Sequence, residues 1–214
     1  MTKSGVKRLL SLLDAHYPRN MRFLNYETPW QLLVATILSA QCTDARVNMV
    51  TPGLFAKYPG IDELAEADLD ELAREIRPTG FHRSKAGHII GSMQTLRDGY
   101  GGVMPDDIDI LTTFPGVGRK TGNLVIGHIY GIPGIVVDTH VMRVSARLGL
   151  TSGKNPVKIE RELMKALPEE HWIRFNTQII AHGRAVCTAR PPKCGDCILS
   201  CCCGYFLGGI ISSQ

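Results

Sequence analysis

The sequence predicts an all-α protein. Apolar side chains recur at helical spacing along most of its 214 residues, no segment alternates apolar and polar residues as a half-buried strand does, and no internal repeat is present. Residues 135–137 are apolar and β-branched, but they are only three long and a helix start follows them. We therefore expect an extended link there and helices elsewhere.

Helix starts and stops divide this pattern into elements. Thr28 can cap a helix, with Pro29 in its first turn and Gln31 completing a capping box, and Ser84 is a second candidate cap. Predicted helices cover residues 4–16, 28–38, 47–55, 61–76, 84–96, 109–111, about 119–130, 138–150, 156–167 and 175–182. The expected layout is a central helical domain over 22–133, with 1–21 and 134–214 forming a terminal domain.

Charge gives only weak information about partners. The formal net charge is +4, but residues 62–75 hold seven acids and one base, so the remaining surface must be more basic than the total indicates. The acidic run is interpreted as a solvated helix face. The start of the chain lacks a signal-peptide pattern and no apolar run could span a bilayer, so we expect a soluble intracellular protein.

A glycine-rich turn lies at residues 111–123, with the sequence Leu-Thr-Thr-Phe-Pro-Gly-Val-Gly-Arg-Lys-Thr-Gly-Asn. Gly116 and Gly118 allow the chain to fold back with its backbone N–H groups exposed, and a helix starts at once. Free amides and the positive dipole end of a helix attract an anion, and Arg119 adds a full charge. The segment around Val117 is therefore predicted to hold a phosphate.

Lys120 stands in the first turn of that helix, where the positive dipole end favours its neutral amine. A neutral amine is a nucleophile, whereas an ordinary lysine is almost fully protonated at neutral pH. The alternative is a lysine that only contacts phosphate, and the local sequence slightly favours it.

Asp138 is the expected partner of Lys120. As an N-cap it would accept backbone N–H bonds that keep its carboxylate ionised. The cap role alone is a common alternative. Because the chain reverses at residues 131–134, we expect Lys120 and Asp138 to face one cleft.

Six of the seven cysteines fall between residues 187 and 203. Cys194 and Cys197 form one short Cys-x-x-Cys pair, and Cys187 precedes this pair as a single cysteine. From spacing alone, the fourth thiolate could be any of Cys201, Cys202 and Cys203. Four thiolates suit zinc or an iron–sulfur cluster, and zinc ribbons usually contain two short pairs, so the cluster is favoured. Arg190 and Lys193 lie between the first two cysteines, where they could contact phosphate or be ordinary surface charge.

With these pieces assembled, the chain resembles the endonuclease III family of DNA repair glycosylases over nearly its whole length. Residues 114–120 look like the family's helix-hairpin-helix with its catalytic lysine, about 108–130 in all. Residues 137–140 look like its catalytic aspartate segment, and the cysteine spacing is that of its 4Fe–4S loop, with Cys203 as the fourth ligand. Residues 38–41 and 43–44, and 80–81 with 84–86, match the segments around the damaged-base pocket.

This resemblance implies two helical subdomains flanking a DNA-binding cleft. Gln41 would fill the gap left by an extruded nucleotide, and Phe81 would wedge the base stack with His82 beside it. His140 would contact DNA, and Ser39 and Asp44 would line the pocket. Phe114 and Thr112 depart from the family's usual residues, as do the additional Cys42, Cys201 and Cys202.

The implied activity is that of a bifunctional DNA glycosylase and AP lyase. It would remove oxidised pyrimidines from double-stranded DNA through an imine between Lys120 and the sugar, then cut 3′ to the abasic site by β-elimination, with Asp138 assisting. The resemblance also implies a structural cluster and a monomer in the cytoplasm of a prokaryote, associated with the nucleoid. A non-catalytic DNA-binding module, a redox protein and a mismatch-type glycosylase remain as alternatives.

Overall fold

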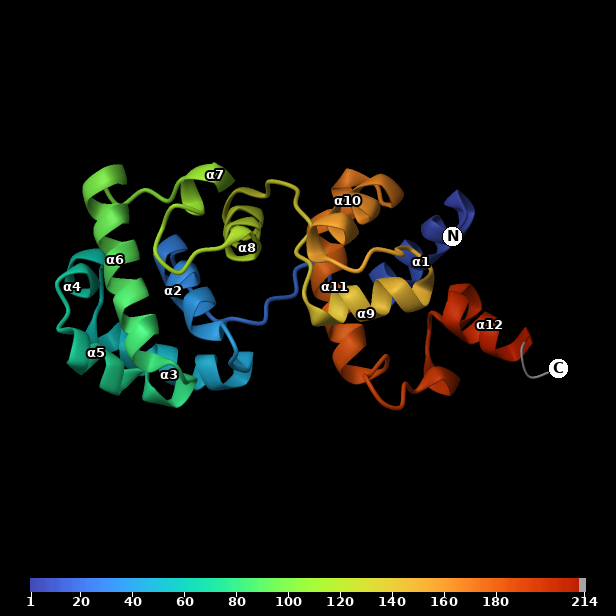
Figure 1. Ribbon diagram of the computed structural model, residues 1–214, viewed down its shortest axis with the longest axis horizontal. Coiled ribbons are helices and arrows are strands. Elements are labelled where there is room, and N and C mark those ends of the chain that lie inside the picture. Colours follow the sequence, from blue (N-terminus) through green and yellow to red (C-terminus); the bar gives the residue numbers. More distant parts are fainter. Residues whose placement is uncertain (212–214) are drawn as a thin grey trace. The chain divides into compact units, whose positions relative to one another are not determined.

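The computed structural model describes residues 1–211, with side chains described through Gly208, and every regular element in that range is helical (Figure 1). The all-α prediction is confirmed, and residues 135–137 form an extended link. The α-helices are α1 (Lys3–His16), α2 (Pro29–Ser39), α3 (Asp44–Lys57), α4 (Ile61–Ala65), α5 (Leu69–Glu75), α6 (His82–Tyr100), α7 (Ile108–Leu111), α8 (Arg119–Tyr130), α9 (Thr139–Leu148), α10 (Pro156–Ala166), α11 (Trp172–Ala185) and α12 (Gly204–Ile211). Short 3₁₀ turns are η1 (Arg77–Thr79), η2 (Glu169–His171), η3 (Cys194–Asp196) and η4 (Ser200–Cys202). No helix of the described chain is long and apolar enough to cross a lipid bilayer.

The chain divides into two compact units. The central unit is the continuous segment Arg22–Ile132, and the terminal unit combines Met1–Met21 with Pro133–Gln214. Each unit has its own cluster of buried apolar side chains, so each has its own core.

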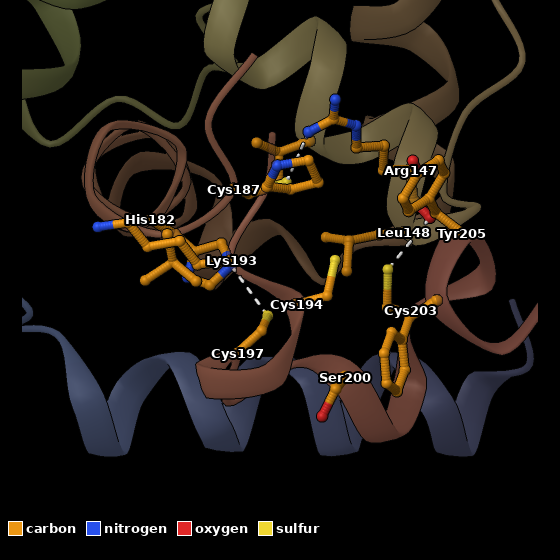
Figure 2. A pocket seen from close by; sticks show the side chains of 14 residues that line it. Arg147, Leu148, His182, Cys187, Lys193, Cys194, Cys197, Ser200, Cys203 and Tyr205 are labelled. Carbon is orange, nitrogen blue, oxygen red and sulfur yellow. Dashed lines mark hydrogen bonds between the residues drawn. The ribbon is translucent and has the colours of Figure 1, made fainter. Parts of the chain in front are cut away.

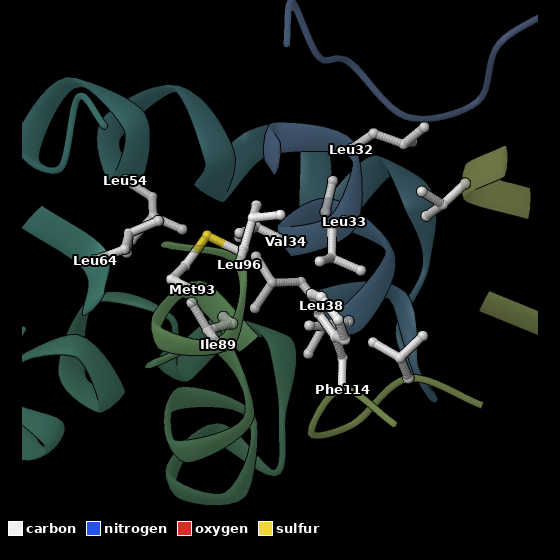
Figure 3. Packing of buried hydrophobic residues seen from close by; sticks show 14 of the residues in the cluster. Leu32, Leu33, Val34, Leu38, Leu54, Leu64, Ile89, Met93, Leu96 and Phe114 are labelled. Atoms are coloured by element: carbon white, nitrogen blue, oxygen red, sulfur yellow. The ribbon is translucent and has the colours of Figure 1, made fainter. Parts of the chain in front are cut away.

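The core of the central unit forms between α2 and α6. Leu33 and Leu38 of α2 lie among Ile89, Met93 and Leu96 of α6, and all five are almost fully buried (Figure 3). Phe114, just before the glycine-rich turn, extends the same cluster and is only 2% exposed. The turn is therefore attached to the hydrophobic core of its unit.

The core of the terminal unit joins segments from both ends of the chain. Leu9 and Leu13 of α1 are fully buried with Phe175 and Ile179 of α11. The Tyr17 hydroxyl lies 2.9 Å from Nδ1 of His182 in α11. Residues 1–21 are thus an integral part of this unit.

The structure corrects two details of the predicted helices. The segment 61–76 is not one helix, because Asp68 caps α5 by accepting a bond from the Glu71 N–H at 2.8 Å. Ser84 is not a cap, because α6 begins at His82 and Phe81 occupies the cap position in left-handed backbone. The acidic side chains of this segment are mostly exposed, as predicted, and two of its carboxylates, those of Glu71 and Glu75, pair with Lys57 at 2.8 and 2.6 Å.

Candidate active site and cysteine pocket

The glycine-rich turn connects α7 to α8 and has the geometry that the sequence predicts. Gly116 adopts φ of +75°, and a β-carbon there would lie 2.8 Å from the His88 side chain. Gly118 is the N-cap of α8, and both glycines are exposed while Val117 between them is buried. The turn thus combines a tight backbone with the amide-rich start of a helix, which is an arrangement suited to an anion.

Helix α6 packs against this turn. The Ser92 hydroxyl donates to the Pro115 carbonyl at 2.7 Å. A β-carbon on Gly91 would lie 3.0 Å from the Pro115 ring, so the two segments are in close contact. The position of the turn is therefore fixed by α6 as well as by the buried Phe114.

Lys120 lies in the first turn of α8, directly after the exposed Arg119. Its side chain is exposed, so its amine is accessible to a substrate. Lys120 belongs to the central unit.

Asp138 is the N-cap of α9 in the terminal unit, as the sequence predicts. One of its oxygens accepts the Val141 N–H at 2.8 Å, and the other lies 3.1 Å from Nδ1 of His140. Both oxygens have a partner, so the carboxylate has a fixed orientation. That Lys120 and Asp138 face one cleft stays a prediction.

Gln41 and Phe81 share an unusual backbone. Their φ values are +53° and +47°, and no other non-glycine residue of the described chain has positive φ. Such a conformation costs roughly 1–3 kcal/mol and is concentrated at functional sites. Both side chains are exposed, Phe81 to 65% of its surface, although it is a large apolar residue. These are the two residues expected to enter the duplex.

The other predicted residues of the base pocket and DNA interface are placed as follows. The Ser39 hydroxyl donates to the Thr36 carbonyl at 2.8 Å, at the end of α2. Asp44 is the first residue of α3, and His82, half-buried, is the first residue of α6. Arg190 and Lys193 are exposed, and no described acid lies between them in the sequence.

Four thiols of the C-terminal segment line one pocket of the terminal unit (Figure 2). Its wall contains Cys187, Cys194, Cys197 and Cys203, whereas Cys201 and Cys202 are absent from it. The four thiols gathered there are the four that the resemblance selects. Burial raises the pKa of the Cys197 thiol.

Two arginines of α9 hold the loop that carries Cys187. Arg147 donates to the carbonyls of Thr188 and Ala189 at 2.7 and 3.0 Å. Its Nη1 lies 3.4 Å from the Cys187 sulfur (Figure 2). Arg143 donates to the Cys187 carbonyl at 3.2 Å. Neither arginine is predicted from the sequence, since their only signal is the i, i+4 spacing of two arginines on one helix.

His182 was missed as well. Its Nε2 lies 3.4 Å from the Cys197 sulfur (Figure 2). The Tyr17 hydroxyl contacts its other ring nitrogen. Burial lowers the pKa of His182 to about 4, so the imidazole is neutral at physiological pH.

The donors at this pocket fit an iron–sulfur cluster chemically, since four thiols surround a space shielded by apolar and basic side chains. Over the described residues, no group of three or more His, Cys, Asp or Glu side chains is placed so that it could hold a metal ion. The residue types and spacing of the C-terminal cysteines are consistent with a cluster.

Comparison with known proteins identifies related chains. Residues 34–169 match the sequence profile of the HhH-GPD superfamily base excision DNA repair proteins. An endonuclease III from Synechocystis sp. is 50% identical over 202 residues, which cover 94% of this chain and 92% of the relative.

Two solved structures are similar over the whole chain. One is a trapped covalent intermediate of endonuclease III with DNA, with a TM-score of 0.90, 39% identity and coverage of 98% of this chain and 99% of the other. The other is a non-covalent endonuclease III–DNA complex, with a TM-score of 0.91, 39% identity and coverage of 99% of both chains.

Proposed function

Because the chain belongs to the endonuclease III family, and is thus a bifunctional DNA glycosylase and AP lyase of base excision repair, we propose that Lys120 is its nucleophile. The observation that carries this proposal is the exposed lysine in the first turn of α8, directly after a turn shaped to hold a phosphate. We further propose that the central and terminal units are the two domains that flank the DNA, and that the substrates are oxidised pyrimidines in double-stranded DNA.

The turn at Gly116–Gly118 would bind a backbone phosphate through its amides, with Arg119 adding charge. Gln41 and Phe81, with His82 beside them, would enter the duplex where the damaged nucleotide has been extruded. The extruded base would be contacted by Ser39 and Asp44. The DNA backbone would be contacted by His140, Arg190 and Lys193. These contacts would position C1′ of the damaged nucleotide for attack.

The neutral Lys120 amine would attack C1′, and the bond from C1′ to the base would break with its electron pair leaving on the base. Asp138 would stabilise positive charge on the sugar and relay the proton that the amine loses. The nitrogen lone pair then opens the sugar ring, which leaves an imine between Lys120 and C1′. The imine makes the C2′ proton acidic, and its removal expels the 3′ phosphate, so the strand is cut by β-elimination.

Cys187, Cys194, Cys197 and Cys203 would hold a 4Fe–4S cluster, whose contribution when bound is structural. It would fix the segment 187–203 and thereby present the basic residues Arg190 and Lys193 at a constant position. Support comes from the pocket that gathers these four thiols and no others of the described chain. Iron and inorganic sulfide analysis of the purified protein tests this, and bound zinc without iron would contradict it.

Borohydride reduction in the presence of duplex DNA containing thymine glycol or an abasic site tests the nucleophile. Wild type should form a covalent adduct and Lys120→Gln should form none while still binding DNA. The exposed Lys154 of the terminal unit provides a control, since Lys154→Gln should trap as wild type does. DNA binding without any adduct would indicate a non-catalytic DNA-binding module. Release of the base without cutting of the strand would indicate a mismatch-type glycosylase.

A further inference from the structure

Lys85 is a buried lysine in the second turn of α6. It is only 4% exposed, and its ammonium donates to the carbonyls of Leu38 and Thr79, each at 2.8 Å. Leu38 lies in the last turn of α2, and Thr79 ends the 3₁₀ turn η1. Burial lowers the pKa of Lys85, which reflects the cost of removing its charge from water.

Each of these carbonyls lies just before one of the two strained residues. Leu38 precedes Gln41 by three residues, and Thr79 precedes Phe81 by two. The left-handed backbone of Gln41 and Phe81 is sterically unfavourable for residues with a β-carbon, so it persists only where neighbouring contacts maintain it. The Lys85 ammonium is a contact shared by both turns.

The other bonds at these turns are local. The Cys42 N–H donates to the Ser39 carbonyl at 3.0 Å across Gln41, and the Gly80 N–H donates to the Arg77 carbonyl at 3.2 Å before Phe81. Each bond closes one turn but does not connect it to the other. Lys85 does connect them, and its positive charge suits the carbonyl end of α2.

An apolar side chain would fill this site without the cost of burying a charge, and it would leave two carbonyls without their donor. The ammonium group has three N–H donors on a long flexible stem, so one side chain can reach two separate backbone segments. Packing alone therefore does not account for a lysine at this buried position.

We propose that Lys85 is a positioning residue that holds Gln41 and Phe81 at a fixed separation, so that both side chains enter the DNA duplex as a preformed pair. This inference rests on the roles proposed above for these two residues. With the turns already ordered, DNA binding does not have to order them, and the energy of binding is available to bend the duplex and extrude the nucleotide.

The first test compares two substrates. Lys85→Met removes the donors at similar volume, and Lys85→Gln keeps a shorter one. Under single-turnover conditions, Lys85→Met should release thymine glycol from duplex DNA about 10- to 100-fold more slowly than wild type, since a small misplacement has effects of that order. The rate of base release by Lys85→Gln should lie between those of wild type and Lys85→Met. Borohydride trapping on a single-stranded abasic oligonucleotide should stay near wild type, because no base stack must be opened there.

The matched control lies in the same helix. Gln94 donates through Nε2 to the Ala65 carbonyl at 2.9 Å, so Gln94→Met also removes a side-chain bond from α6 to a backbone carbonyl. It is away from both strained turns in sequence and should change neither rate. An equal slowing by Gln94→Met would overturn the proposal.

A mutant cycle separates positioning from general stability. In a Gln41→Ala, Phe81→Ala background, Lys85→Met should cause no further slowing. The same slowing in both backgrounds would show that Lys85 acts elsewhere and would overturn the inference. So would a Lys85→Met protein that does not fold at any temperature, since Lys85 would then determine the fold and not the two turns.

The two proposals can fail separately. If wild type traps no DNA, the proposed function fails and the inference with it. If wild type traps DNA and Lys85→Met releases base from duplex at the wild-type rate, only the inference about Lys85 fails.

Discussion

The hairpin turn of the central unit and the cysteine loop of the terminal unit are both expected to meet the DNA backbone, but they are held by different interactions. The buried side chains of Phe114 and Val117 anchor the hairpin in the apolar core of its unit, and α6 packs against it. The cysteine loop is held by bonds from Arg143 and Arg147 to its carbonyls and by a pocket lined with thiols. The position of the hairpin should therefore depend on apolar packing, and the position of the loop on the proposed cluster and on the two arginines.

The strongest test of this difference removes the apolar anchor of the hairpin. Phe114→Ala should lower the free energy of unfolding by about 3–5 kcal/mol, because the ring is almost fully buried, and should weaken DNA binding. Phe175→Ala removes an equally buried ring from the terminal unit and should cost a similar amount while sparing the hairpin. Denaturant unfolding and DNA affinity measure the two effects. Unchanged DNA affinity in folded Phe114→Ala would contradict the first half of the comparison.

The next largest effect concerns the arginine that holds the cysteine loop. Arg147→Met should make the visible absorbance of the proposed cluster disappear about tenfold or more faster in the presence of a chelator. Removing a residue that supports a metal ligand commonly has an effect of this size. Arg161→Met, which removes the same charge from an exposed position of α10, should have no effect. Equal rates for both variants would show that Arg147 does not stabilise the loop.

A smaller effect is expected from the backbone of the hairpin. Gly116→Ala should cost about 1–2 kcal/mol, since φ is +75° and the new methyl group would meet His88. DNA affinity should fall, while the rate at which the proposed cluster is lost should not change. Gly99→Ala in α6, with open space around it and ordinary φ, should instead be neutral or stabilising by about 0.5–1 kcal/mol. Faster loss of the proposed cluster in Gly116→Ala would show that the hairpin and the cysteine loop are not supported independently.

The smallest expected effect is a pH dependence of the central unit. Burial lowers the pKa of His128 in α8, whose Nδ1 lies 3.4 Å from the Tyr26 hydroxyl. The folded state therefore resists protonation, and stability is lost as pH falls from the ordinary histidine value of about 6.5 toward the lower folded value. His128→Gln should lose less stability than wild type over this range in urea unfolding. If the free energies of unfolding of His128→Gln and wild type changed equally with pH, the expected contribution of His128 would be contradicted.

Much of the fold follows from local rules that the sequence displays. Helical periodicity and the cap residues predict most elements, including Asp138 at the start of α9 and Gly118 before α8. The start of α6 could not be predicted, because a left-handed phenylalanine at a cap position violates the local preference and is maintained by tertiary contacts. Local sequence preference and the final conformation disagree at Phe81, where a function is proposed.

The sequence predicts candidate site residues where the residue and the groups that position it lie in one segment, as at Gly116–Lys120. It does not predict residues that act on a distant segment of the chain. Arg147 contacts backbone carbonyls some forty positions away, and Lys85 reaches the carbonyl of Leu38. Carbonyl partners have no side-chain signature in a sequence, so only the folded chain reveals them.

The discontinuous terminal unit has a consequence for synthesis on the ribosome. Residues 22–132 form one continuous unit, so they can fold while translation continues. Residues 1–21 emerge first but must wait for α11, since Leu9 packs in the same core as Phe175 and Tyr17 contacts His182. The wall of the cysteine pocket therefore assembles last, and the turn at Gly116–Gly118 can form in the nascent chain before the four pocket thiols come together.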